Sequence, residues 1–200
     1  MDRRVGRIET PALAILGGLA VWLISTQVFP YHSLNHDEGV YLQQAAMLLD
    51  GQLNLWPPVD GVFRPWFFIE DGDRLYPKYS PVPAAVFALG RVVGGYRLAL
   101  IGVTMANLAL VSAVVREVFD RRTGFLAAAT VLASPLFLLD SAVFLPYAPT
   151  TMFNLAFAYA YFRGDRSGDR RWPIAAGAAI GVAFFARPYT AVLFASPFIA

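Results

Sequence analysis

The chain contains no cysteine, only two histidines and few charged side chains. The absence of cysteine excludes a disulfide framework, a thiolate zinc site and a cysteine nucleophile. Two histidines, His32 and His36, exclude a histidine-rich metal cage. A formal net charge of +2 is too small to indicate a nucleic-acid partner.

Charge is scarce enough to place the chain in the membrane class. Charged residues make up 15% of the sequence, whereas an average soluble domain carries about a quarter. Apolar residues make up 57%, and the mean hydropathy is +0.51. Together with long apolar runs, these values predict an integral protein of the cell membrane.

The first long apolar run covers residues 11–29 and predicts a membrane-spanning helix. At 1.5 Å per residue it reaches about 28 Å, which is enough to cross a hydrocarbon core of about 30 Å. A secretory signal peptide is the alternative, but the run is long and no small-residue cleavage site follows it, which favours an uncleaved anchor. Further spans are predicted over about residues 96–119, 123–145, 149–162 and 172–200.

The predicted fold class is all-α, a polytopic transmembrane helix bundle with about five spans. A polar outer loop over residues 30–79 follows the first span and is expected to carry amphipathic helices along the membrane surface. Residues 80–93 are apolar but proline-containing and too short to span comfortably, so they predict a re-entrant or interfacial helix. Because the last run is still apolar at Ala200, residues 1–200 are expected to be one N-terminal membrane portion, truncated at the C-terminus.

The distribution of basic residues predicts the orientation of this bundle. Of the 16 lysines and arginines, ten lie on the short segments that share the side of the N-terminus: Arg3, Arg4, Arg7, Arg116, Arg121, Arg122, Arg163, Arg166, Arg170 and Arg171. Basic residues concentrate on the cytoplasmic side of membrane proteins. We therefore expect a cytoplasmic N-terminus, with the loop over residues 30–79 outside.

Two adjacent acids, Asp37 and Glu38, follow the outer end of the first predicted span. Such a pair suits catalysis, with one carboxylate as general base and the other orienting it or binding a metal ion. A structural interpretation competes: Asn35-x-x-Glu38 has the spacing of a capping box, and an apolar stripe begins at Tyr41 in a helix that Gly51 would end. The two interpretations are compatible, since a carboxylate at a helix N-terminus is well held.

Basic side chains form the second group of candidates. Lys78 stands among tyrosines and prolines where the chain returns to the membrane, which suits either an anionic headgroup or an interfacial anchor. Arg187, followed by Pro188, lies inside the last predicted span, where an ionisable group points to a cavity unless it snorkels. Asp140 is either its partner or interfacial, and Arg97 has a similar position at the start of its span. These candidates converge on the outer membrane surface.

The order of these features resembles the GT-C class of membrane glycosyltransferases, in particular the protein O-mannosyltransferase and aminoarabinose-transferase branch. The shared features are an Asp-Glu pair after the first span, a Lys/Tyr/Pro-rich return to the membrane, an Arg-bearing span with a basic end, and a later Arg-Pro. Here they are Asp37-Glu38, Tyr76 to Pro83, Arg97 to Arg122 and Arg187-Pro188. The resemblance implies transfer of a sugar from a polyprenyl- or dolichyl-phosphate-linked donor to an acceptor hydroxyl on the non-cytoplasmic face.

The resemblance also implies roles for individual residues. Asp37 would be the general base, and Glu38 would support the site or bind a divalent metal ion. Lys78, with Tyr79 beside it, would hold the lipid phosphate, and Arg187 or Arg97 would help to neutralise it. One departure is that the family often has an acid where this chain has Tyr147-Ala148-Pro149-Thr150, and Asp140 is not in register to replace it.

Two other classes of protein are compatible with the same features. A transporter or flippase fragment would place paired charges near the midplane and show internal repeats, whereas here the charges cluster outside and no repeat is found. A non-catalytic membrane subunit would carry these charges incidentally. The expected partners are a lipid-linked sugar donor, membrane lipid and an acceptor that is a protein, a lipid or a polysaccharide.

Overall fold

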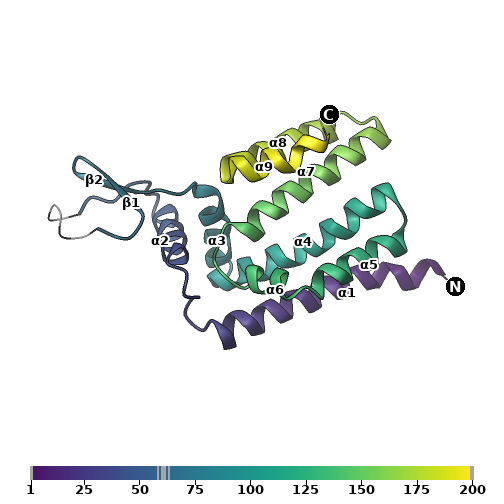
Figure 1. The fold of residues 1–200 in the computed structure, drawn as a ribbon, viewed down its shortest axis with the longest axis horizontal. Coiled ribbons are helices and arrows are strands. Elements are labelled where there is room, and N and C mark those ends of the chain that lie inside the picture. The colour runs from purple at the N-terminus through teal and green to yellow at the C-terminus, as the bar shows by residue number, and fades with distance from the viewer. Residues whose placement is uncertain (1, 58, 60–61, 63, 199–200) are drawn as a thin grey trace.

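The computed structural model describes residues 2–57, 59, 62 and 64–198, with side chains from Thr10 onward. Figure 1 shows a bundle of helices with a small β-hairpin projecting from one end. The described residues form nine α-helices: α1 (Asp2–Leu23), α2 (Asp37–Leu49), α3 (Pro81–Val92), α4 (Tyr96–Val118), α5 (Arg121–Leu132), α6 (Pro135–Ser141), α7 (Tyr147–Ser167), α8 (Arg171–Ala186) and α9 (Pro188–Ala195). A π-helical turn over Ile24–Val28 continues α1, and a 3-10 turn over Ser196–Phe198 follows α9.

Two helical segments of the described chain are long and apolar enough to cross a membrane. They are Thr10–Val28 and Tyr96–Val118, with mean hydropathies of 1.6 and 2.2, and they coincide with two of the predicted spans. The pair α5 and α6 forms a third candidate, which is bent by 71° as a broken span or a re-entrant loop. The described residues thus contain two or three candidate spans where about five were predicted, together with the shorter apolar helices α3 and α8.

Prolines interrupt two of the predicted spans. In the stretch 123–145, Pro135 starts α6 after Ser134, whose hydroxyl accepts the N–H of Phe137. In the stretch 172–200, one residue separates the end of α8 from Pro188, which starts α9, and residues 199–200 lie outside the described chain. A proline has no N–H to donate and clashes with the preceding turn, so a helix stops before it and a new helix begins at it.

The outer loop contains strands, so the all-α prediction is wrong there. β1 (Phe68–Asp71) and β2 (Arg74–Pro77) pair antiparallel, with Phe68 opposite Pro77. Gly72 provides the positive φ of 67° that a tight hairpin turn requires. The hairpin is attached to α2 by a small apolar cluster of buried side chains: Val40, Met47, Phe68 and Leu75.

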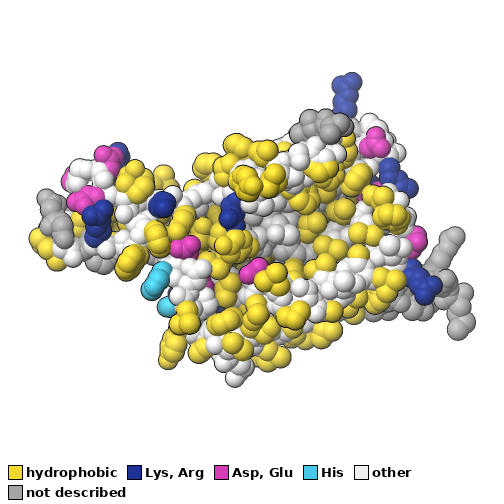
Figure 2. All heavy atoms as spheres, in the orientation of Figure 1, with side chains coloured by type: hydrophobic (Ala, Val, Ile, Leu, Met, Phe, Trp, Pro, Cys, Tyr) yellow, Lys and Arg dark blue, Asp and Glu magenta, His cyan; other side chains and the backbone are white. Residues whose placement is uncertain are grey.

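Close packing of α1, α4, α5 and α7 forms the body of the bundle. Gly17 of α1 lies so near α4 that an added Cβ would stand 2.4 Å from Cδ1 of Leu108. The largest apolar cluster, which includes Val21, Phe87 and Phe144, joins α1, α3 and the segment between α6 and α7 to α2. Figure 2 shows the consequence at the surface: hydrophobic side chains cover much of the visible face, and charged ones gather over the hairpin and at the opposite end.

Candidate active site

The first turn of α2 holds the acid pair. His36 is the N-cap residue, and the side-chain oxygen of Asn35 accepts the N–H of Asp37 at 3.0 Å. Asp37 therefore occupies the first helical position, where the unpaired N–H groups of the helix favour a negative charge. As predicted, α2 ends next to Gly51, which has a φ of 71°.

Glu38, the second acid of the pair, is only 1% exposed. One oxygen accepts the backbone N–H of Ser33 at 2.7 Å and the hydroxyl of the same residue, and the other accepts the backbone N–H of Phe144 at 2.7 Å. The predicted capping box with Asn35 is not formed, because these contacts draw the Glu38 carboxylate into the interior. Glu38 thus connects the start of α2 to the segment that leads into α7.

Asp37 faces a group of tyrosines. The hydroxyl of Tyr79 donates to Oδ1 of Asp37 at 2.9 Å. The ring of Tyr79 stacks on that of Tyr41 with 5.2 Å between centroids, and Tyr41 in turn lies edge-on to Phe87. Burial and the hydrogen bond to Asp37 raise the pKa of Tyr79 to about 12. Burial also raises the pKa of Tyr41, so both phenols are neutral at physiological pH.

Arg187 occupies the break between α8 and α9. Its backbone is extended, with φ of −151° and ψ of 90°, and its guanidinium carbon lies 4.6 Å from the ring centroid of Tyr147. Tyr147 is the first residue of α7 and was not among the candidate residues predicted from the sequence. Its position directly after Pro146, where the related family often has an acid, was the signal that could have identified it.

One cavity of about 300 Å³ brings these groups together. Asp37, Tyr79, Tyr147 and Arg187 all line it. They come from the start of α2, the segment before α3, the start of α7 and the turn between α8 and α9. The cavity thus combines a carboxylate with a guanidinium, which is what a proton transfer coupled to the departure of an anion requires.

Lys78 and Arg97 lie outside the lining of this cavity. The ammonium of Lys78 is 5.6 Å from the ring centroid of Phe67, which itself packs on Tyr79, so Lys78 lies near the rim. Arg97 donates to the carbonyl oxygens of Ser25 at 3.1 Å, Phe29 at 3.2 Å and Pro30. Its contacts satisfy carbonyl groups at the C-terminal end of the first span, which is a structural task.

The residues around the cavity do not fit a divalent metal ion. Among the described residues, no three His, Asp or Glu side chains gather closely enough to hold one. Both oxygens of Glu38 already accept hydrogen bonds from the protein. We therefore derive no catalytic step through a metal.

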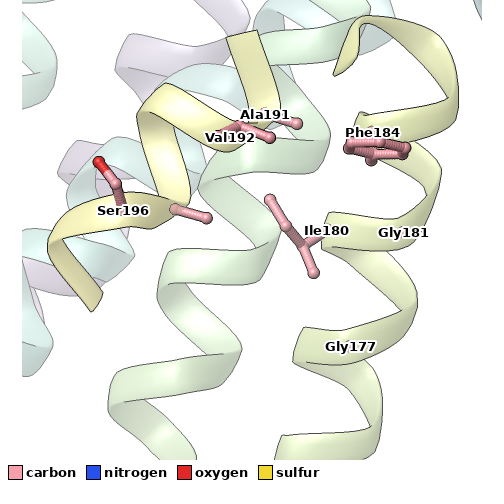
Figure 3. Close-up of a pocket in the computed structure, with 8 residues that line it drawn as sticks. Gly177, Ile180, Gly181, Phe184, Ala191, Val192 and Ser196 are labelled. Carbon is pink, nitrogen blue, oxygen red and sulfur yellow. The ribbon is translucent and has the colours of Figure 1, made fainter. Parts of the chain in front are cut away.

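A second cavity, of about 670 Å³, lies between α8 and α9. Figure 3 shows Ile180 pointing from α8 toward α9, which contributes Ala191 and Val192 to the lining. Its lining is almost entirely apolar, and it includes Gly177 and Gly181, which leave room between the two helices. Residues of the α8–α9 turn thus line the first cavity, and the two helices that the turn joins line an apolar groove.

The comparison with known families decides the class of protein. The family model described as dolichyl-phosphate-mannose-protein mannosyltransferase matches residues 82–200, more than half of the chain. The chain belongs to this family. Membership confirms the predicted resemblance and implies a mannosyltransferase type of activity that depends on a lipid-phosphate-linked sugar. Searches of curated proteins and of solved structures found no match.

The match to the mannosyltransferase family includes some candidate residues and leaves out others. Arg97, Tyr147 and Arg187 lie within the matched residues, whereas Asp37 and Lys78 precede them. Roles for individual residues therefore depend on their geometry. Family membership and the apolar helices together make this an integral membrane glycosyltransferase.

Proposed function

We propose that this chain transfers a mannosyl-type sugar from a polyprenyl- or dolichyl-phosphate donor to an acceptor hydroxyl, with Asp37 as general base. The observation that carries the proposal is the shared cavity of Asp37 and Arg187. The two side chains are 150 residues apart in sequence, and an unpaired charge near the membrane is costly unless it serves a site. Membership of the mannosyltransferase family supplies the donor class.

The chemistry follows from the two charges. The acceptor oxygen attacks the anomeric carbon while Asp37 removes its proton, and the bond between that carbon and the phosphate oxygen breaks. The electron pair leaves with the lipid phosphate, whose added charge Arg187 neutralises. A positioned base and a preorganised cation are both worth most where water is excluded, as in a partly enclosed cavity.

The neighbouring tyrosines and Glu38 hold the base in place. Tyr79 donates to one oxygen of Asp37, and among the described residues the other oxygen accepts no hydrogen bond, so it is available to the acceptor. Tyr147 supports Arg187 by a cation–π contact. Glu38 is a positioning residue, because it binds the segment before α7 and thereby fixes the position of Tyr147 relative to Asp37.

The apolar groove between α8 and α9 suits the isoprenoid chain of the donor. Phe184 and Ala191 of the groove lie within four residues of Arg187, which faces the polar cavity. The hydrocarbon tail of a donor whose phosphate is bound at Arg187 would enter this groove, whose lining Figure 3 shows. Lys78, near the rim, is proposed as a second contact to the phosphate.

We further propose the membrane arrangement that the basic residues predict. The N-terminus would be cytoplasmic, and the acid pair would face the other side of the membrane. The helix α7 and the segment formed by α8 and α9 would be the last of about five crossings. Residues 1–200 would form one membrane unit in which the loop over residues 30–79 covers the cavity.

The test measures consumption of a lipid-linked sugar by the protein in membranes. Dolichyl- and undecaprenyl-phosphate mannose are supplied, and release of the lipid phosphate is followed for wild type, Asp37→Asn and Asp50→Asn. Asp50 is a matched control because it ends the same helix that Asp37 begins. We expect Asp37→Asn to lower kcat about a hundredfold or more, the usual contribution of a general base, and Asp50→Asn to behave as wild type.

Two outcomes would overturn the proposal. Normal turnover by Asp37→Asn would mean that Asp37 is a helix-start residue without a part in the reaction. Failure of the wild type to consume any donor, with lipid translocation between leaflets instead, would favour the transporter hypothesis.

A further inference from the structure

A polar cavity of about 660 Å³ lies at the end of the bundle opposite the β-hairpin. It opens between the C-terminal parts of α4 and α7, which Figure 1 shows side by side. Arg116 and Glu117 line it from α4, and Tyr159, Arg163 and Arg166 line it from α7. None of these residues belongs to the candidate active site.

Positive charge is in excess in this cavity. Glu117 pairs with Arg163 at 3.4 Å and with Arg166 at 3.3 Å, and Arg166 also donates to the Glu117 carbonyl at 2.8 Å. Within the described chain Arg116 has no ion-pair partner, so three guanidinium groups face one carboxylate. Two positive charges in a cavity remain to be balanced by something outside the protein.

Close helix packing holds Arg116 in its position. An added Cβ on Gly124 of α5 would stand 2.5 Å from Cγ of Arg116 and 2.7 Å from the carbonyl oxygen of Ser112. The side-chain stem of Arg116 is thus pressed between α4 and α5. The stem of Arg116 therefore contacts α5, while the side chains of Arg116, Arg163 and Arg166 remain exposed and accessible to a ligand.

The surroundings of the cavity are those of a membrane interface. Tyr159 packs edge-on against Trp172, with 5.5 Å between ring centroids, and such amphipathic aromatics favour the headgroup level. Val118, Phe119 and Ile174 nearby are 51%, 69% and 73% exposed. Apolar side chains that emerge beside a basic cavity favour an anion that carries hydrocarbon chains.

We propose that this cavity binds the phosphate group of an anionic phospholipid. Guanidinium groups are suited to phosphate because their fork of donors matches two of its oxygens. Basic cavities between transmembrane helices are a recurrent form of lipid headgroup site. The lipid would bridge α4 and α7 at the end distant from the chemistry.

The experiment compares lipid retention by purified protein in detergent. Native mass spectrometry counts bound phosphatidylglycerol or phosphatidylcholine for wild type, Arg116→Gln, Arg163→Gln and Arg170→Gln. Arg170 is the matched control, since it precedes α8 at the same end of the bundle and does not line the cavity. We expect Arg116→Gln and Arg163→Gln each to weaken retention of phosphatidylglycerol about fivefold, and Arg170→Gln to retain it as wild type does.

A gain-of-binding variant separates the site from general damage. Glu117→Gln removes the carboxylate that competes for the arginines and is expected to tighten retention, which misfolding would not do. Inorganic phosphate is added as a competitor. If it displaces phosphatidylglycerol only at a concentration far above that of the lipid, the site is assigned to a lipid. If it displaces the lipid at equal concentration, the site is assigned to free phosphate. Equal retention of phosphatidylcholine, or equal losses in Arg116→Gln and Arg170→Gln, would overturn the proposal.

Discussion

The two polar cavities lie at opposite ends of the same bundle and are assembled differently. The cavity of Asp37 and Arg187 draws its side chains from four separate segments, and helix starts and turns contribute most of them. The cavity of Glu117 draws its side chains from two neighbouring helices, α4 and α7. On each helix the lining residues lie within about two turns of one another. The first balances one negative and one positive charge, whereas the second has an excess of positive charge.

This difference suggests what each end of the bundle is suited to do. Opposite charges held apart across a cavity can take up a proton on one side and stabilise a departing anion on the other. Arginines that outnumber the carboxylate beside them are suited to hold an anion.

The largest expected effect is on stability and distinguishes two glutamates. Glu38→Ala leaves the buried N–H of Phe144 and the partly buried N–H of Ser33 without an acceptor, which should lower the free energy of unfolding by about 2–5 kcal/mol. Glu117→Ala should cost less than about 1 kcal/mol, because the arginines that it contacts reach water. Denaturant unfolding in detergent micelles measures both, and equal costs would contradict the interior role of Glu38.

The next effect distinguishes two arginines by catalysis. Arg187→Gln should lower kcat/KM for the lipid-linked donor by about tenfold or more, because the leaving phosphate loses its cation. Arg116→Gln, at the other end, should leave kcat/KM unchanged. A steady-state comparison of the two variants checks this, and a similar loss in both would show that net charge, and not position, matters.

A smaller effect concerns Arg97, which was predicted to bind the substrate. Its hydrogen bonds to the carbonyl groups of Ser25 and Phe29 indicate that Arg97→Gln lowers the free energy of unfolding by about 1–3 kcal/mol. Turnover per folded molecule should stay within about twofold of wild type. A rise in KM for the donor, with the free energy of unfolding unchanged, would show that Arg97 binds the substrate as first predicted.

The smallest effect is that of Tyr79→Phe. Loss of the hydrogen bond to Asp37 should lower kcat roughly threefold, since the base is less firmly oriented. Because the pKa of Tyr79 is raised to about 12 from 10.0, its contribution to folding is present below about pH 10 and is lost as the pH rises toward 12. The difference in tyrosinate absorbance between wild type and variant should therefore stay flat near pH 10 and rise toward pH 12.

Parts of this fold were predictable because their causes are local. The spans near residues 11–29 and 96–119 follow from apolar composition, and the end of α2 follows from the glycine that adopts positive φ there. The β-hairpin was missed although Gly72-Asp73 marks its turn, because amphipathic helices were the only regular structure expected in the long polar loop. The breaks at Pro135 and Pro188 carried a visible signal too, since each proline begins a new helix.

Composition and local pattern determined that this chain is a helical membrane protein, and the order of its short motifs determined its family. The partners of Glu38, Arg97 and Arg187 depended on packing between distant segments. Glu38 and Phe144 are 106 residues apart, and no local pattern couples them. The tertiary structure decided that Glu38 is buried, that Arg97 caps carbonyl groups and that Arg187 lines a cavity. Burial and hydrogen bonding depend on neighbours that the chain brings together only when it folds.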